Sequence, residues 1–497
     1  MPDNKYDVII IGAGLGGLEC AFMLQKVGMK VLVLEADALI GGCLQTFRRQ
    51  GHTFDTGFHY VGGLDQGQML WRLFKYYKLL DLPWRKMDED CFDEVRLPTG
   101  SYPFAQGYEH FRETLTSLFP AQADNLKNYV ALLKDVGDNI ANSFNPRSAD
   151  DVYSQSLFAR SAHEFLTATI SDPTLQDVLS GTSLKMELNA QKLPLYVFAQ
   201  INSSFIQSAY RIAGGGMQIA ESLRQSFESM GGTLLRSKRV TAFEAADGKA
   251  TAVIVNDGAE RYEAQTFISN AHPATTVRLL HTAGLVRKVF QRRIENLENT
   301  FGMLTVNVAL KPGTLPYQNK NIFAYTENNV WSLHSQPRNG LKAIMISFMP
   351  PTDGSPYASG LDILTPMSWD EVSKWFGTKI GCRGEDYVEF KERFADQCLA
   401  MAARYVDGLQ DAHLAHWVST PLTYADYTST EHGSAYGIRK DYNATMFTVL
   451  TPKTPVQNVF LTGQNLNLHG ILGTSMTSMF TCAEIIGMPK VVSELNA

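Results

Sequence analysis

The sequence has no excess of basic residues, no paired cysteines and no long apolar run. Its 44 lysines and arginines stand against 50 acidic residues, a net charge of −6, which argues against a nucleic-acid-binding protein. The six cysteines are scattered and form no C-x-x-C pair, so neither a disulfide framework nor a zinc site is indicated, and this usage fits a reducing compartment. No apolar run approaches the roughly 20 residues that span a bilayer, and no signal peptide precedes the first strand. These absences predict a cytoplasmic protein, one that could still make peripheral contact with a membrane.

Length and composition indicate a globular protein with more than one hydrophobic core. A chain of 497 residues is longer than one core usually supports, which predicts two domains. Apolar residues make up 44% of the chain and charged residues 19%, so disorder is not indicated. The sequence shows no internal repeat and no low-complexity tract, and it predicts no metal site.

A dinucleotide-binding pattern lies near the start of the chain. Residues 6–12, YDVIIIG, form an apolar run that predicts a strand buried on both faces. The glycines that follow are spaced G-x-G-x-x-G. Gly12 allows a tight turn, Gly14 lets a pyrophosphate approach the backbone, and Gly17 lets the next helix pack closely. That helix, which Gly28 ends, would hold the pyrophosphate at its N-terminus.

A second predicted strand, KVLVLE, ends at Glu35. A carboxylate in this position accepts hydrogen bonds from a ribose diol and would repel a 2′-phosphate. The order strand, glycine turn, helix, strand and acid predicts a dinucleotide site rather than a coincidental glycine-rich turn. The triple glycine of IAGGGMQIAESL lacks this order, so no second nucleotide-binding domain is predicted.

Two further segments favour a flavin over a nicotinamide. Residues 41–63, GGCLQTFRRQGHTFDTGFHYVGG, have glycines that let backbone pass close to a bulky planar ligand, although a plain loop of turn residues is the alternative. Residues 458–487 predict a strand, a glycine turn and an amphipathic helix. The N-terminal amides of that helix would stabilise negative charge on the pyrimidine ring of a reduced flavin. A C-terminal segment that returns to an N-terminal nucleotide-binding fold is hard to explain for a simple dehydrogenase.

With these motifs, the sequence resembles the FAD-dependent carotenoid desaturase, carotenoid isomerase and retinol saturase group of the amine-oxidase-like flavoprotein superfamily. The likeness is carried by residues 41–63, 214–243, 420–437 and 461–473 and runs along most of the chain. It implies an α/β fold, with a Rossmann-type FAD-binding domain that has a parallel sheet and an N-terminal βαβ unit, and a second, mixed α+β substrate domain. The expected FAD-binding domain is discontinuous and comprises residues 1–75, 205–295 and 420–497. The expected substrate domain comprises residues 76–204 and 296–419.

The resemblance implies FAD as the cofactor and assigns residues to it. The first glycines and Glu35 would hold the ADP half, the backbone near Val240 would meet the adenine, and the turns at 41–43 and 57–59 would pass the isoalloxazine. One departure stands at Gln464, where many flavoproteins of the superfamily have an acid; an amide can still bind a ribityl hydroxyl. The expected cofactor-binding residues are Gly12, Gly14, Leu15, Gly16, Gly17, Glu35, Ala36, Gly41, Gly42, Cys43, Gly57, Phe58, His59, Val240, Gly463, Gln464, Gly470, Ile471, Leu472 and Gly473.

The implied reaction takes place on carbon–carbon double bonds of a long apolar polyene, an isoprenoid or retinoid-like lipid. Such bonds could be saturated, formed or isomerised, and the electron donor or acceptor is left open. His59 is the first candidate for a proton donor, with a structural histidine as its alternative. Tyr436 could donate a proton or simply pack, and His469 is expected near the flavin edge. A packing role is favoured for Cys43 over a redox thiol, and a turn role for Asp55 over a general base.

Two other functions compete with this interpretation. An FAD-dependent amine oxidase needs aromatic side chains flanking the flavin, and the GQNL turn contains no Tyr or Trp. A flavin-scaffold protein that only carries a lipid or polyene would have no need of three flavin-contact segments.

In the second domain, residues 301–349 predict a meander whose strands are GMLTVNVALK, NIFAYT, VWSLHSQ and AIMISFMP. Residues 69–86 predict a helix that either packs on the core or lies on a membrane surface.

Overall fold

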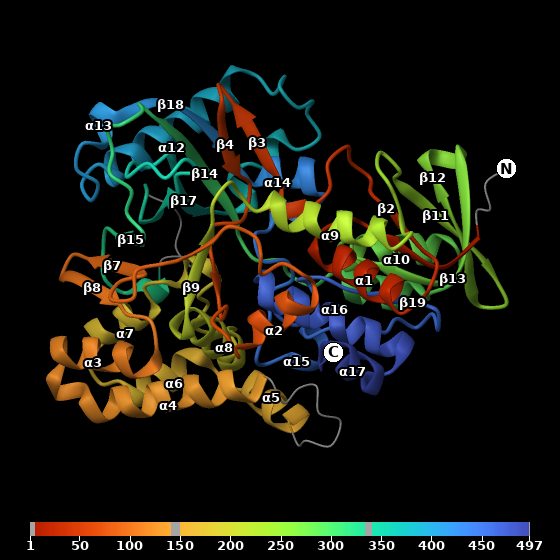
Figure 1. The fold of residues 1–497 in the computed structure, drawn as a ribbon, viewed down its shortest axis with the longest axis horizontal. Coiled ribbons are helices and arrows are strands. Elements are labelled where there is room, and N and C mark those ends of the chain that lie inside the picture. The colour runs from red at the N-terminus through yellow and green to blue at the C-terminus, as the bar shows by residue number, and fades with distance from the viewer. Residues whose placement is uncertain (1–4, 141–149, 333–339, 497) are drawn as a thin grey trace.

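The computed structural model describes residues 5–140, 150–332 and 340–496. Its strands form two large sheets, the first on the right of Figure 1 and the second at the upper left. The first sheet has the order β10 (Thr233–Leu235), β2 (Val31–Leu34), β1 (Lys5–Ile11), β13 (Glu260–Ser269), β12 (Lys249–Val255) and β11 (Val240–Ala246), and β19 (Val459–Leu461) also pairs with β13. β10, β2, β1, β13 and β19 pair with one another in parallel, whereas β12 is antiparallel to both β13 and β11.

The N-terminal βαβ unit is formed as the sequence predicts. β1 leads through a glycine turn into α1 (Leu15–Lys26), which returns the chain to β2 beside β1. Val8, Ile9 and Ile10 are fully buried, because helices cover one face of the sheet and the β11–β12 hairpin and α10 (Pro273–Thr282) cover the other. The predicted α/β class with a Rossmann-type sheet is confirmed.

The C-terminal segment returns to this sheet from the far end of the chain. β19 joins β13 at its C-terminal half, and a glycine turn leads into α16 (Gly470–Ile486). α16 packs along α1, and α9 (Met217–Ser229) packs on the other side of α1 (Figure 1). The carboxyl ends of β1, β2, β13 and β19 therefore meet at one edge, where open α/β sheets bind ligands.

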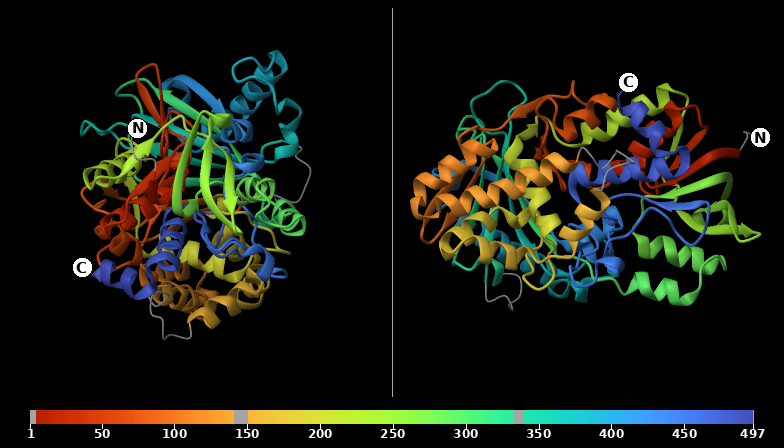
Figure 2. Two further views of the ribbon diagram at one scale, coloured as in Figure 1. Left: turned by 90° about the vertical axis from the view of Figure 1, so that its right-hand side faces the viewer. Right: turned by 90° about the horizontal axis from the view of Figure 1, so that it is seen from below.

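The second sheet is mostly antiparallel and is buried on both faces. Its order is β18 (His413–Ser419), β14 (Gly302–Leu310), β17 (Gly360–Met367), β16 (Ala343–Met349), β15 (Asn321–Tyr325), β7 (Asp93–Leu97) and β8 (Gly100–Phe104), with β15 and β7 parallel. Ile344 and Ile346 face α12 (Glu385–Ala402), whereas Met345 faces a layer of helices on the opposite side. This layer is seen from below in Figure 2 and comprises α3 (Tyr108–Leu118), α4 (Ala123–Asn139), α5 (Asp150–Phe158), α6 (Ala162–Thr169), α7 (Pro173–Ser180) and α8 (Leu195–Gln207).

One predicted strand of the meander is wrong. VWSLHSQ begins with a short 3₁₀ helix, Val330–Ser332, and its remaining residues lie outside the described part of the chain. The Asp177 carboxylate accepts hydrogen bonds from the amides of Asn329 and Val330, both at 2.8 Å, and the indole of Trp331 donates to Ser180 Oγ. The amides of Asn329 and Val330 are therefore bonded to α7 and are not available to pair with a neighbouring strand. The other three predicted strands are β14, β15 and β16.

Smaller elements connect the two sheets. α2 (Met69–Tyr76) buries Met69, Leu70, Leu73 and Phe74, as the packed-helix alternative for residues 69–86 predicts, and ends ten residues earlier than that range. The short strands are β3 (Thr46–Arg49), β4 (His52–Asp55), β5 (Val61–Gly62), β6 (Trp84–Lys86) and β9 (Ala209–Ile212), and the remaining helices are α11 (Lys288–Glu295), α13 (Leu409–Ala412), α14 (Pro421–Thr428), α15 (Thr445–Thr448) and α17 (Met488–Asn496). In the described ranges, no helix combines the length and the apolar character needed to cross a bilayer.

The strands of the first sheet all come from the segments expected in the FAD-binding domain. Those of the second sheet all come from the segments expected in the substrate domain. The β3–β4 hairpin belongs to the first set of segments, yet Phe54 packs against Trp417 of the second sheet, at 5.5 Å between ring centroids. We keep the domain boundaries as a proposal.

Candidate active site

One cavity of about 420 Å³ joins the carboxyl edge of the first sheet to helix α8 under the second sheet. Of the residues assigned from the sequence to a cofactor or to proton transfer, Gly17 alone does not line it. At one end lie the glycine turns and Val240, and at the other lie mainly apolar side chains of the second sheet and α8. Cavities of a few hundred cubic ångströms with few polar groups are typical small-molecule sites.

The β1–α1 turn presents backbone rather than side chains to this cavity. Gly12 has a φ of 98°, a conformation that glycine adopts readily, and Gly14 caps α1 without any side-chain hydrogen bond. The N-terminal amides of α1 are therefore available for an anion. Gly17 faces the strand instead, since a Cβ there would lie 2.0 Å from the Gly12 carbonyl oxygen. Its role is close packing of α1 on β1.

Glu35 holds the shape of this turn. Its Oε2 accepts a hydrogen bond from the Ala13 amide at 2.7 Å, and its Oε1 accepts one from the Asp37 amide at 2.9 Å. Burial raises the pKa of this carboxyl. Each carboxylate oxygen can accept a further hydrogen bond, so the contacts leave room for the ribose diol that the sequence predicts here.

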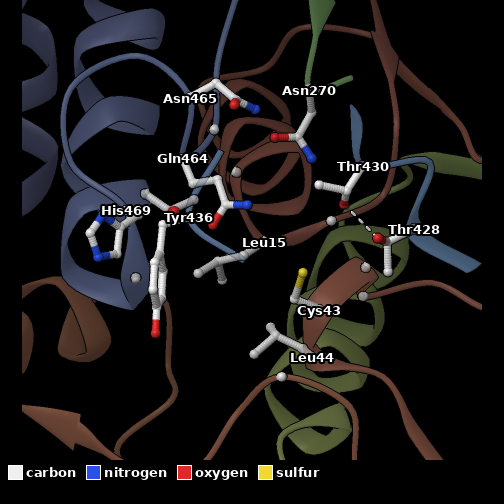
Figure 3. Close-up of a pocket in the computed structure, with 18 of the residues that line it drawn as sticks. Leu15, Cys43, Leu44, Asn270, Thr428, Thr430, Tyr436, Gln464, Asn465 and His469 are labelled. Carbon is white, nitrogen blue, oxygen red and sulfur yellow. Dashed lines mark hydrogen bonds between the residues drawn. The ribbon is translucent and has the colours of Figure 1, made fainter. Parts of the chain in front are cut away.

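Asn270 connects the first glycine turn to the C-terminal one, and sequence reasoning missed it. It follows β13 directly, at the same sheet edge as the turns. A Cβ at Gly14, Gly16 or Gly463 would lie 2.6–2.8 Å from an amide atom of Asn270. In Figure 3, Asn270, Gln464 and Cys43 extend from different sides into one central space. The glycines thus make room for the asparagine as well as for a ligand.

The N-terminus of α16 faces the same space. Its first turn, Gly470–Gly473, lines the cavity, and its N-cap residue His469 makes no side-chain capping bond. The partial positive charge of a helix N-terminus favours negative charge on a neighbouring ligand. This arrangement suits the pyrimidine edge of a reduced flavin, as expected from the sequence.

Tyr436 and His469 lie together beside this helix terminus, and both are held by backbone carbonyls. Their rings are 4.4 Å apart between centroids (Figure 3). The Tyr436 hydroxyl donates to the Leu184 carbonyl, and His469 Nε2 lies 3.0 Å from the Lys185 carbonyl. Burial raises the pKa of Tyr436 and lowers the pKa of His469 to about 4, so both are neutral near pH 7. The contact favours the packing alternative for Tyr436.

His59 stands between this cavity and a second, polar one of about 310 Å³. Its Nδ1 lies 3.5 Å from Asp362 Oδ2, and Asn307 donates to the other Asp362 oxygen at 2.6 Å. Its Nε2 is buried and has no hydrogen-bond partner in the described residues. A histidine that is held through one nitrogen and free at the other is suited to exchange a proton with a ligand.

Asp55 and Cys43 occupy structural positions. Asp55 lines the second cavity and accepts a hydrogen bond from the Gly216 amide at 2.7 Å, while burial raises its pKa to about 7. This anchoring contact fits the predicted turn role. Burial raises the pKa of the Cys43 thiol to about 11, so it is protonated at neutral pH and poorly suited to nucleophilic or redox chemistry.

The far end of the cavity is apolar apart from a few groups on one wall. Its apolar lining includes Ile201, Phe205, Met303, Met345 and Leu364. Lys185 and Gln200 are among the polar residues of the lining that sequence reasoning missed. Lys185 lies in SLKMELNA, where the family resemblance is weakest, and neither residue belongs to a motif that could have marked it.

The comparisons with known proteins agree with this geometry. The family described as NAD(P)-binding Rossmann-like domain matches residues 10–77. The chain is 27% identical to an all-trans-retinol 13,14-reductase of Danio rerio over 97% of this chain and 86% of that protein. It is 25% identical to a chloroplastic prolycopene isomerase of an Oncidium hybrid cultivar over 87% of this chain and 75% of that protein. The predicted family resemblance is confirmed.

The chain also shares its fold with solved amine-acting oxidases, among them putrescine oxidase. The structure of putrescine oxidase bound to putrescine superimposes with a TM-score of 0.66 and 17% identity, over 98% of this chain and 100% of that one. At such low identity the likeness shows the fold and not the substrate. The fold is therefore shared with a protein that acts on a different class of substrate.

Proposed function

We propose that the protein is an FAD-dependent oxidoreductase that acts on carbon–carbon double bonds of a long apolar polyene of isoprenoid or retinoid type. One observation carries the proposal: a single cavity joins a dinucleotide-binding edge to an apolar pocket lined by the second sheet and α8. The named activities of the reductase and isomerase relatives support this substrate class. A location in the cytoplasm and peripheral contact with a membrane stay predictions.

The residues at the dinucleotide edge fit FAD. Gly12, Gly14 and the free N-terminus of α1 suit the pyrophosphate, Glu35 suits the adenosine ribose, and the N-terminus of α16 suits the pyrimidine ring. When bound, FAD supplies hydride or single-electron transfer to a carbon atom of the ligand. The protein positions the polyene along the cavity, keeps water away from it and exchanges a proton at a defined place.

His59 is the residue that we assign to proton exchange. Its side chain lines the cavity, its Nδ1 faces the Asp362 carboxylate at 3.5 Å, and its Nε2 has no hydrogen-bond partner in the described residues. Tyr436 is less suited, because its hydroxyl proton is donated to a backbone carbonyl.

An amine oxidase is the weaker alternative. The ammonium group of Lys185 lines the cavity and would repel a protonated amine that entered it. The turn from Gly463 to Leu466 has no aromatic side chain to flank the flavin.

Mixing the reduced protein with polyenes tests the proposal. The purified yellow protein is reduced with dithionite without oxygen and mixed with retinol, short carotenoids and an unsaturated fatty acid as control. We expect one polyene to reoxidise the flavin while its own conjugated absorbance is lost, which identifies saturation. If none does, the oxidised protein is mixed with the same polyenes, and new conjugation or a changed isomer identifies desaturation or isomerisation. A protein that binds no flavin, or that changes none of these ligands in either state, contradicts the proposal.

A His59→Gln variant is expected to react slowly while keeping its flavin and its substrate affinity. Positioned proton donors contribute about 10²- to 10⁴-fold to rates, so we expect the rate of flavin reoxidation by the polyene to fall about 100-fold or more. Rapid-mixing absorbance measures the rate, and a ligand titration of the oxidised protein measures affinity.

His52→Gln is the matched control, because His52 lines the second cavity without reaching the first. It should retain the wild-type rate. Equal rates in wild type and His59→Gln would assign His59 a structural role.

A further inference from the structure

Lys185 places an ammonium group in the wall of the apolar pocket. It ends a short 3₁₀ helix, Ser183–Lys185, and its side chain is 10% exposed and lines the cavity. The Nζ atom lies 4.3 Å from the centroid of the Phe205 ring and 3.5 Å from Asp93 Oδ2. In the described residues this carboxylate is its one ion-pair partner.

The buried charges around Lys185 do not balance. Asp93 is fully buried and accepts hydrogen bonds from the Tyr60 hydroxyl at 2.9 Å and the Asn321 amide at 2.8 Å. Arg211, 1% exposed, donates to the other end of the Asn321 amide at 2.6 Å, and its charge also acts on Asp93. Two buried cations thus share one carboxylate, within the described residues. Burial of an uncompensated charge is costly.

The cost is visible at Lys185 itself. Burial lowers the pKa of its ammonium group to about 8, although Asp93 acts in the opposite direction. The group is still mostly charged at neutral pH. A negatively charged ligand beside it would complete the charge balance and restore the ammonium to its ordinary range.

Gln200 supplies a second incomplete group in the lining of the same cavity. It lies on α8, is 2% exposed and lines the cavity, and its side-chain oxygen has no hydrogen-bond partner in the described part of the chain. Buried amide atoms without a partner are uncommon in folded proteins. Because an amide can turn either its oxygen or its nitrogen to a ligand, Gln200 can bond an acidic or a hydroxyl head group.

We propose that Lys185 and Gln200 form a head-group subsite, and that the substrate is a polyene with a terminal carboxylate that pairs with Lys185. The polyene chain then extends over Phe205, Met345 and Leu364 toward the flavin end. The inference rests on the proposed function and adds the substrate's head group to it. It excludes hydrocarbon carotenoids as the preferred ligands.

Three ligands with the same skeleton test the subsite: retinoic acid, its methyl ester and retinol. Each is titrated into the oxidised, flavin-loaded protein, and binding is followed by quenching of tryptophan fluorescence. We expect the acid to bind about tenfold or more tightly than the ester, as a buried charge-assisted contact implies. Lys185→Met should abolish this ratio, and Lys185→Arg should keep most of it.

Lys320→Met is the matched control. Lys320 pairs with Glu94 on the strand that also carries Asp93, but it does not line the cavity, so the ratio of acid to ester affinity should persist in this variant. If Lys185→Met does not fold, Gln200→Leu and the wild-type ligand series still decide the question. Equal affinities for acid and ester in the wild type, or a ratio that survives in Lys185→Met, would overturn the subsite.

The same ligands separate failure of the subsite from failure of the proposed function. If the ester and retinol bind and reoxidise the reduced flavin as fast as the acid, the polyene function stands and the carboxylate subsite is rejected. If none of the three binds or reacts, and the short carotenoids also remain unchanged with the reduced and the oxidised protein, both are rejected.

Discussion

A Gly14→Val variant is expected to fold and to carry no flavin. Gly14 has φ −73° and ψ 175°, which valine adopts readily, so the backbone is not strained by the change. A Cβ at this position would meet one neighbouring side chain, the amide of Asn270 at 2.8 Å, which is able to rotate. The rest of the valine side chain would project into the cavity at the N-terminus of α1. It would take the space predicted for the pyrophosphate.

The expected loss is large because the contact involves backbone amides that no other group can replace. We expect affinity for FAD to fall about 100-fold or more, equivalent to roughly 3 kcal/mol. The ratio of flavin to protein absorbance in the purified variant measures this loss, and its circular dichroism should match that of flavin-free wild type.

Gly28→Asn is the matched control at the other end of the same helix. Gly28 has a φ of 93°, where asparagine adds some backbone strain at the end of the helix, but among the described residues no atom beyond its chain neighbours lies within 4 Å of the position that a Cβ would take. This variant should remain yellow. A Gly14→Val protein that retains its flavin would show that the pyrophosphate does not lie at this turn.

The dinucleotide edge could be predicted from the sequence because its determinants are local. The apolar run of β1, the glycine turn and α1 follow one another within a short stretch, and each has its own pattern. The return of β19 and α16 was predicted in the same way, although its position beside β13 rests on contacts across the whole chain.

The apolar end could not be predicted, because its polar groups meet only in the folded chain. Lys185 ends a 3₁₀ helix, Asp93 begins β7 of the second sheet, and Arg211 lies on the short strand β9. No sequence motif joins these three residues. Asn270 was missed for a similar reason, because its amide packs against three glycines that lie far from it in the sequence. The wrong strand at Val330 also depends on a distant residue, the carboxylate of Asp177 on α7.

Glu19 occupies the interface between the two helices that border the flavin site. It lies in the middle of α1 and is fully buried, with Oε1 accepting a hydrogen bond from Ser475 at 2.5 Å and Oε2 one from Ser478 at 2.9 Å, both on α16. Burial raises its pKa to about 8, and the two serines only partly oppose this effect. The carboxyl is therefore protonated in the folded protein at neutral pH.

A Glu19→Gln variant is expected to become more stable than wild type as the pH rises. In the unfolded chain Glu19 ionises near its ordinary pKa of 4.5, whereas in the folded protein it keeps its proton up to about pH 8. The stabilising contribution of Glu19 to wild type is therefore fully present below pH 4.5 and is lost as the pH rises toward about 8. Each unit of pKa difference is worth about 1.4 kcal/mol, so the variant should gain roughly 5 kcal/mol relative to wild type near pH 9 and little near pH 4.

Glutamine suits the site because it has the shape of the protonated acid and can bond both serine hydroxyls, which rotate freely. Urea unfolding of the flavin-loaded proteins across this pH range measures the difference. Glu494→Gln on α17 is the contrasting control, because Lys490 and Lys26 lower the pKa of Glu494, so its removal should not stabilise the protein at high pH. A Glu19→Gln effect of the same size at every pH would show that the carboxyl is ionised in the fold, and that the α1–α16 interface binds a charge there.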